Sequence, residues 1–217
     1  MDDYQDCLRK LLSYIQELFA NDSSGHDYFH SVRVYKNAMK IAEDEDCDRH
    51  IVMMAALLHD VDDAKLFQTV DYANARKILE DCTVSGTDVE KVVDVIQSVS
   101  YRGVDSVTPQ TIEGKIVQDA DRLDAMGAIG IARAFAYGGS RGRKMYDPEI
   151  SPKLEMDERE YREQEGTTIN HFYEKLFLLK DMLNTDTAKR MAEKRQRFME
   201  RFLEEFYAEW NGEERML

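Results

Sequence analysis

Hydrophobic residues recur every three or four positions along most of the chain, which is the spacing of amphipathic helices. The first stripe runs from Leu8 to Phe19 and is followed by the polar segment NDSSG at 21–25, which is typical of a helix end. Further stripes lie at 34–42, 49–59, 72–79, 89–96, 112–123, 172–183 and 191–210. No segment alternates between apolar and polar residues as a half-buried strand does. The pattern therefore predicts an all-α protein.

Capping residues mark the expected starts of two of these helices. The segment Thr87-Asp88-Val89-Glu90 has the form of a capping box. Thr108-Pro109 offers an N-cap followed by a first-turn proline. The helix that follows Thr108 is expected to continue or bend through Ala134.

The helical pattern fails between Gly138 and Gly166, where prolines, glycines and charged residues are dense. We expect a long surface loop there, with at most short helical pieces, because unstructured stretches of this length are uncommon and often functional. The chain shows neither an internal repeat nor a clear linker. It is therefore expected to form a single all-α domain over 1–217, with C-terminal helices at 167–211 packed on an earlier core.

Composition narrows the possible partners. Hydrophobic residues make up 43% of the chain, and the formal net charge of −14 disfavours binding to long nucleic acids, which calls for a basic surface. A small anionic substrate stays possible, because local cations can override the global charge. Three scattered cysteines, an acidic N-terminus and the lack of a membrane-length apolar run predict a cytoplasmic protein without membrane contact. Nothing in the pattern specifies an oligomeric state.

Histidines and aspartates interrupt three of the apolar stripes. His30 lies four residues before Val34 and extends that stripe, and His59 ends the stripe at 49–59 and is followed by Asp60. A third group crowds the stripe at 112–123 and consists of Asp119, Asp121 and Asp124. Each alone is explained by a buried histidine, a helix cap or an exposed end. Together they suggest a shared divalent cation, because an unpaired buried carboxylate is costly.

Mixed imidazole and carboxylate donors suit several cations. Mn²⁺ is the first expectation, and Mg²⁺, Fe²⁺, Ni²⁺, Co²⁺ and Zn²⁺ are possible. A structural zinc site would favour thiolates. The sequence contains no GxxxxGK phosphate loop, no GxGxxG after a strand and no HExxH motif.

These motifs, in this order, resemble the HD superfamily of metal-dependent phosphohydrolases over about residues 26–128. The matching segments are GHDYFHSVRV, AALLHDVDDAK and the DADRL element. A closer resemblance, to a bacterial subgroup, runs through KIVQDADRLDAMGAIGIARAFAYGG, GRKMYDP and TTINHFYEKL. Some members of that subgroup are described as nucleoside triphosphate pyrophosphohydrolases. The resemblance implies that the metal ligands are His30, His59, Asp60 and Asp121. Periodicity leaves the three aspartates of the third group open, and only the resemblance selects Asp121.

The resemblance also implies hydrolysis of a phosphate bond in a small nucleotide. Release of pyrophosphate from a nucleoside or deoxynucleoside triphosphate is the first expectation, and removal of phosphate from a nucleoside monophosphate is the next. A non-catalytic HD module that binds a nucleotide for regulation is the alternative from another class.

Residues around the motifs are candidates for catalysis and substrate binding. Asp63 lies four residues after His59, one turn on if the helix continues, and is expected to orient or deprotonate the attacking water; a helix-end aspartate is the simpler interpretation. The candidates for contacts with substrate are Lys65, Arg33, Arg122 and His26. Arg122 equally fits a structural ion pair, and His26 with Asp27 could serve a second metal. The SRGRK run at 140–144 could close over a triphosphate.

Overall fold

The computed structural model describes residues 2–20, 27–63, 66–99, 108–154 and 166–213. The described residues form helices and connecting turns without a strand, which confirms the predicted all-α class. The chain divides into two compact units, Met1–Asp121 and Arg122–Leu217. The expected single domain over 1–217 stays a prediction. No described helix is both long enough and apolar enough to cross a membrane.

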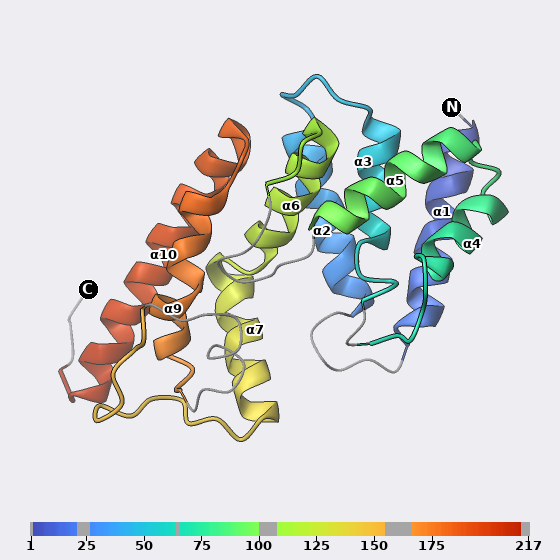
Figure 1. Ribbon diagram of the computed structural model, residues 1–217. Helices are drawn as coiled ribbons and strands as arrows, with labels where there is room; N and C mark the ends of the chain where they lie inside the picture. The colour runs from blue at the N-terminus through green and yellow to red at the C-terminus, as the bar shows by residue number, and fades with distance from the viewer. Residues whose placement is uncertain (1, 21–26, 64–65, 100–107, 155–165, 214–217) are drawn as a thin grey trace. The chain divides into compact units, whose positions relative to one another are not determined.

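The first unit is built around one apolar helix (Figure 1). The helices run in the order α1 (Asp2–Leu18), α2 (Tyr28–Ile41), α3 (Arg49–Leu58), α4 (Ala73–Asp81), α5 (Gly86–Val99) and α6 (Ile112–Asp124). Helix α3 packs against α1, α2 and α5, and all its residues from Ile51 to Leu58 are buried. Its start is fixed by Asp48, whose side chain accepts hydrogen bonds from the backbone N–H groups of His50 and Ile51.

Two helix starts differ from the expected ones. Helix α5 begins before Thr87, because Ser85 accepts from the Asp88 N–H at 3.2 Å and donates its hydroxyl to the Asp88 carboxylate at 2.9 Å. Helix α6 begins after Thr108, because the Thr111 hydroxyl accepts from the Gly114 N–H at 3.1 Å. In both places several hydroxyl residues compete for the capping position, and local spacing does not decide between them.

The second unit begins inside α6, whose last residues belong to it. It continues with α7 (Gly127–Ser140), α9 (Asn170–Glu174), a 3₁₀ helix η2 (Leu176–Met182) and α10 (Asp186–Trp210). Helix α10 packs against α7 and η2. Phe172 is fully buried and stacks on Phe202 of α10 with ring centroids 5.9 Å apart, so this aromatic pair contributes to the core of the second unit.

Three boundaries in this unit depart from the predictions. The bend after α6 is a break, because α7 restarts at Gly127 with a φ of 70°. Helix α7 runs to Ser140, past the expected start of the loop at Gly138; 141–154 are non-helical, and 155–165 lie outside the described residues. The helix expected over 172–183 is divided into α9 and η2 at Lys175, whose φ of −143° is not helical.

Candidate metal centre

His30 enters the site from the first turn of α2. The carboxylate of Asp27 caps this helix by accepting from the His30 N–H at 2.7 Å. The His30 side chain is 1% exposed, so its imidazole lies inside the first unit. Asp27 therefore has a capping role that explains its position without a metal.

His59 and Asp60 enter the site at the C-terminal end of α3. The helix ends at Leu58 with His59 as its C-cap, and the His59 Nδ1 lies 3.0 Å from the Ala56 carbonyl oxygen. Because a carbonyl oxygen only accepts, Nδ1 carries the proton of this bond. The neutral ring then keeps a lone pair on Nε2, which is the nitrogen directed at His30.

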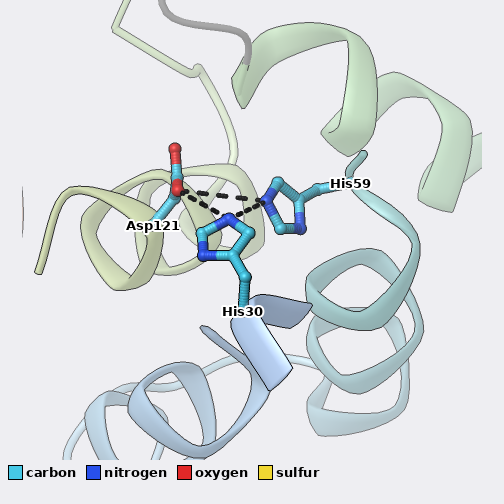
Figure 2. Close-up of side chains that lie close together, drawn as sticks. All are labelled: His30, His59 and Asp121. Carbon is cyan, nitrogen blue, oxygen red and sulfur yellow. Dashed lines mark hydrogen bonds and ion pairs between the residues drawn. The ribbon is translucent and has the colours of Figure 1, made fainter. Parts of the chain in front are cut away.

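Three side chains, those of His30, His59 and Asp121, meet around one point within the first unit, and Asp60 lies beside the two histidines. The Nε2 atoms of His30 and His59 lie 3.3 Å apart, and Asp121 Oδ1 lies 3.4 Å and 3.9 Å from them (Figure 2). Asp60 Oδ2 lies 3.4 Å from the His30 nitrogen and 3.3 Å from the His59 nitrogen. The donor atoms of His30, His59 and Asp121 all lie within 4.8 Å of one another.

This spacing fits a single divalent cation. Donor atoms about 2.1 Å from one ion lie about 3.0 Å apart at octahedral angles and about 3.4 Å apart at tetrahedral angles. Two nitrogens and two carboxylate oxygens are also the donor types that such ions accept. His30, His59 and Asp121 could therefore form a metal site, and the role of Asp60 as a fourth ligand stays a prediction.

The electrostatics of the site favour a positive charge between these side chains. Burial lowers the pKa of His59, but the nearby carboxylates of Asp60 and Asp121 more than offset it and raise the pKa to about 9. A cation with a higher charge placed at the same point would interact with the same two carboxylates.

The three aspartates around α6 have different surroundings, which periodicity alone did not reveal. Asp119 is fully buried. Asp124 is buried in the second unit and pairs with Arg133 at 2.6 Å. Asp121 is the one whose carboxylate faces the two histidines, and Asn37 of α2 donates to the preceding carbonyl, of Ala120, at 3.3 Å.

The two aspartates after His59-Asp60 are also separated by their contacts. Both carboxylate oxygens of Asp62 are engaged by the start of α4, accepting from Asn74 N–H at 3.1 Å and from Ala75 N–H at 2.9 Å. Asp63 lies in a turn, and its N–H donates to the Asp60 carbonyl at 3.1 Å. Helix α3 ends before this turn, so the helical spacing that favoured Asp63 is not present. The capping role of Asp62 favours Asp63 instead, and its catalytic role stays a prediction.

The residues that were predicted to contact the substrate lie in different surroundings. Arg33 lies on α2, one turn after His30, and is half-buried. Arg122 is 7% exposed and donates to the Met182 carbonyl within the second unit, a structural contact. Lys65 and His26 lie outside the described residues. In the SRGRK run, Lys144 pairs with Asp147 at 2.7 Å. The substrate roles of these residues stay predictions.

Two asparagines beside the site were not predicted. Asn37 and Asn74 each donate a side-chain amide to a backbone carbonyl next to one of the site's aspartates, those of Ala120 and Val61. Neither belongs to a motif. Their only signal is a polar side chain on or near a helix face that packs inward, and surface asparagines share that signal.

Comparisons with known proteins agree on one family. A family model described as HD domain matches residues 27–126. The uncharacterized protein YpgQ of Bacillus subtilis is 39% identical over 199 residues, covering 89% of each chain. A crystal structure of an HD-superfamily hydrolase from Bacillus thuringiensis has a TM-score of 0.77 and 43% identity, covering 96% of this chain and 98% of the other. The crystal structure of Bacillus subtilis YpgQ in complex with ADP has a TM-score of 0.76 and 35% identity, covering 95% and 100%.

Proposed function

Because this chain belongs to the HD-domain family, we propose that it is a divalent-metal-dependent phosphohydrolase that releases pyrophosphate from a nucleoside or deoxynucleoside triphosphate. The observation that carries this proposal is the convergence of His30, His59 and Asp121 on one point, with Asp60 beside both histidines. The resemblance to HD-superfamily hydrolases supports the phosphohydrolase class. The choice of triphosphate rests on the likeness to the pyrophosphohydrolase subgroup.

In this proposal His30, His59, Asp60 and Asp121 hold the ion, with Mn²⁺ as the first candidate. When bound, the divalent cation polarises the phosphoryl group and makes a nearby water more acidic. The side chain of Asp121 is 30% exposed, whereas those of His30 and His59 are 1% and 3% exposed. Solvent therefore reaches the site beside Asp121, and the substrate phosphates approach from that side.

The remaining candidates supply proton transfer and charge. Asp63 orients the attacking water and accepts its proton, because its neighbour Asp62 is committed to the cap of α4. Arg33 and Lys65 compensate the charge that builds on the phosphate oxygens.

A relative supports a nucleotide as the substrate. Bacillus subtilis YpgQ has been crystallised in complex with ADP. A nucleoside diphosphate carries the base, the sugar and part of the phosphate chain of a triphosphate substrate. We therefore propose that this chain also takes a nucleotide, in keeping with the expectation of a small anionic ligand.

The experiment is a substrate screen with metal-loaded protein. Purified protein is incubated with Mn²⁺ and a panel of nucleoside and deoxynucleoside tri- and monophosphates, and phosphate, pyrophosphate and nucleoside products are quantified separately. We expect pyrophosphate and a nucleoside monophosphate in equal amounts. Asp121→Asn should abolish this turnover, and Asp94→Asn, which changes an exposed carboxylate on α5, should leave it intact.

Other outcomes would replace the proposal. Phosphate released from monophosphates alone would indicate a nucleotidase. Nucleotide binding without turnover under any of the candidate metals would indicate a regulatory module. Turnover that survives in Asp121→Asn would place the chemistry elsewhere in the protein.

A further inference from the structure

The start of α4 holds the turn that follows Asp60. Asn74 donates its side-chain amide to the Val61 carbonyl at 2.7 Å, while its backbone N–H donates to Asp62 at 3.1 Å. The Ala75 N–H completes the cap with a 2.9 Å bond to the second Asp62 oxygen. The start of α4 thus donates three hydrogen bonds to a turn that lies 12 or 13 residues earlier in the chain.

These hydrogen bonds lie beyond the C-terminal end of α3, where helical hydrogen bonds no longer fix the backbone. The helix ends at Leu58, and beyond it the turn is held by two backbone bonds, from Val61 N–H to the Leu58 carbonyl at 3.2 Å and from Asp63 N–H to the Asp60 carbonyl at 3.1 Å. The Asp60 carbonyl accepts from the Asp63 N–H, and the carbonyl of the next residue, Val61, accepts from the Asn74 amide. Asn74 therefore restrains the residue that directly follows Asp60 in this turn.

The segment that delivers Asn74 is held in an unfavourable backbone conformation. Asp71 and Tyr72 both lie in the left-handed region, with φ of 55° and 53°, although neither is a glycine. Arg76 braces this corner by donating to the Asp71 carbonyl at 2.9 Å and to Glu90 of α5 at 2.6 Å. Such conformations persist where surrounding contacts fix them, and they concentrate at functional sites.

We propose that Asn74 is a positioning residue for Asp60, which fixes the turn through the Val61 carbonyl and thereby sets the affinity of the site for its metal ion. This inference rests on the proposed function, because it takes Asp60 as a ligand. Asn74 itself does not contact the ion. Its effect resembles that of residues that orient metal ligands in other proteins, where removal costs 10–100-fold in affinity.

The test uses two variants of Asn74. Asn74→Asp keeps the size of the side chain and puts a carboxylate in the first turn of α4, where it favours the helix, but it cannot donate to Val61. Asn74→Ala removes the amide altogether. Asn170→Ala is the matched control, because Asn170 also donates its amide to a backbone carbonyl, that of Ile150 at 2.8 Å, within the second unit.

The readouts are taken on metal-free protein that is then loaded. Isothermal titration with Mn²⁺ gives the affinity, and the visible absorption of the Co²⁺ form reports the ligand geometry. We expect both Asn74 variants to bind Mn²⁺ about 10–100-fold more weakly with an altered Co²⁺ spectrum. Asn170→Ala should keep the wild-type affinity and spectrum even if it unfolds more easily.

Two results would overturn the inference in distinguishable ways. If wild type binds the ion and both Asn74 variants match it in affinity and Co²⁺ spectrum, Asn74 has no positioning role. If wild type binds neither ion, the proposed metal site fails, and the role of Asn74 falls with it.

Discussion

Replacing Asp121 by asparagine provides the sharpest test of the metal centre, because it changes the charge and keeps the shape. In wild type, Asp121 Oδ1 lies 3.4 Å from the His30 nitrogen. An ion shared by these two atoms lies about 2.1 Å from the carboxylate oxygen, and a doubly charged ion there attracts it by roughly 16 kcal/mol at an effective dielectric constant of about 20. Desolvation offsets most of this attraction, and we take a hundredfold loss of affinity, about 2.7 kcal/mol, as the lower bound.

Thermal unfolding converts this loss into a measurable shift. At an ion concentration 100 times its Kd, binding stabilises wild type by about 2.7 kcal/mol. For a chain of this size, 1 kcal/mol moves Tm by roughly 2–4 °C, so Mn²⁺ should raise the Tm of wild type by roughly 5–11 °C. At the same Mn²⁺ concentration, a hundredfold weaker variant gains about 0.4 kcal/mol, and its Tm should rise by only about 1–2 °C.

The assay compares Tm in the presence of chelator and of Mn²⁺ for wild type, Asp121→Asn and Asp94→Asn. Each variant is compared with its own metal-free form, so an effect of the substitution on the Tm of the metal-free protein does not enter the shift. Asp94→Asn should keep the full wild-type shift. A wild-type shift retained in Asp121→Asn would refute the assignment of this carboxylate to the ion.

Three further predictions concern the stability of the second unit. Burial lowers the pKa of His171 to about 3, so between pH 6.5 and 3 the folded state binds fewer protons than the unfolded chain. The free energy of unfolding should therefore fall as the pH decreases through this window. His171→Gln should flatten that dependence in denaturant titrations. A Cβ at Gly138 would lie 2.3 Å from the Thr168 hydroxyl oxygen, so Gly138→Ala should cost about 1–3 kcal/mol in urea unfolding, and much less in a Thr168→Ala background. Asp124→Ala leaves the Arg133 guanidinium without its 2.6 Å partner and should destabilise by about 2–3 kcal/mol by the same measurement; an unchanged midpoint would show that this pair contributes nothing.

The sequence predicts most of the helices because their apolar residues repeat with the helical period. It could not place their first residues where several capping side chains lie together. Ser85 rather than Thr87 caps α5, since the hydroxyl of Ser85 meets Asp88 in a reciprocal pair. Which hydroxyl wins depends on how the preceding loop approaches the helix, and that approach is set by tertiary packing.

The sequence points to the motif residues of the candidate site, but it does not reveal the contacts that hold them in place. His30, His59 and Asp60 stand out because polar groups interrupt apolar stripes. The separation of Asp62 from Asp63 depends on contacts with residues at the start of α4, and no spacing within the motif encodes it. The same holds for Asn74, whose partner carbonyl is 13 positions away.

The convergence of side chains from α2, α3 and α6 on one point has a consequence for the abundance of the protein in the cell. His30 and His59 are 29 positions apart, and Asp121 follows much later in the chain. An ion bound to all of them ties distant segments together, as a removable cross-link would. In a simple chain model, closing a loop of about 30 residues is worth roughly 3–4 kcal/mol of unfolded-chain entropy. Scarcity of the metal would then favour unfolding and degradation of this protein, so its abundance, and not only its activity, should follow the supply of the ion.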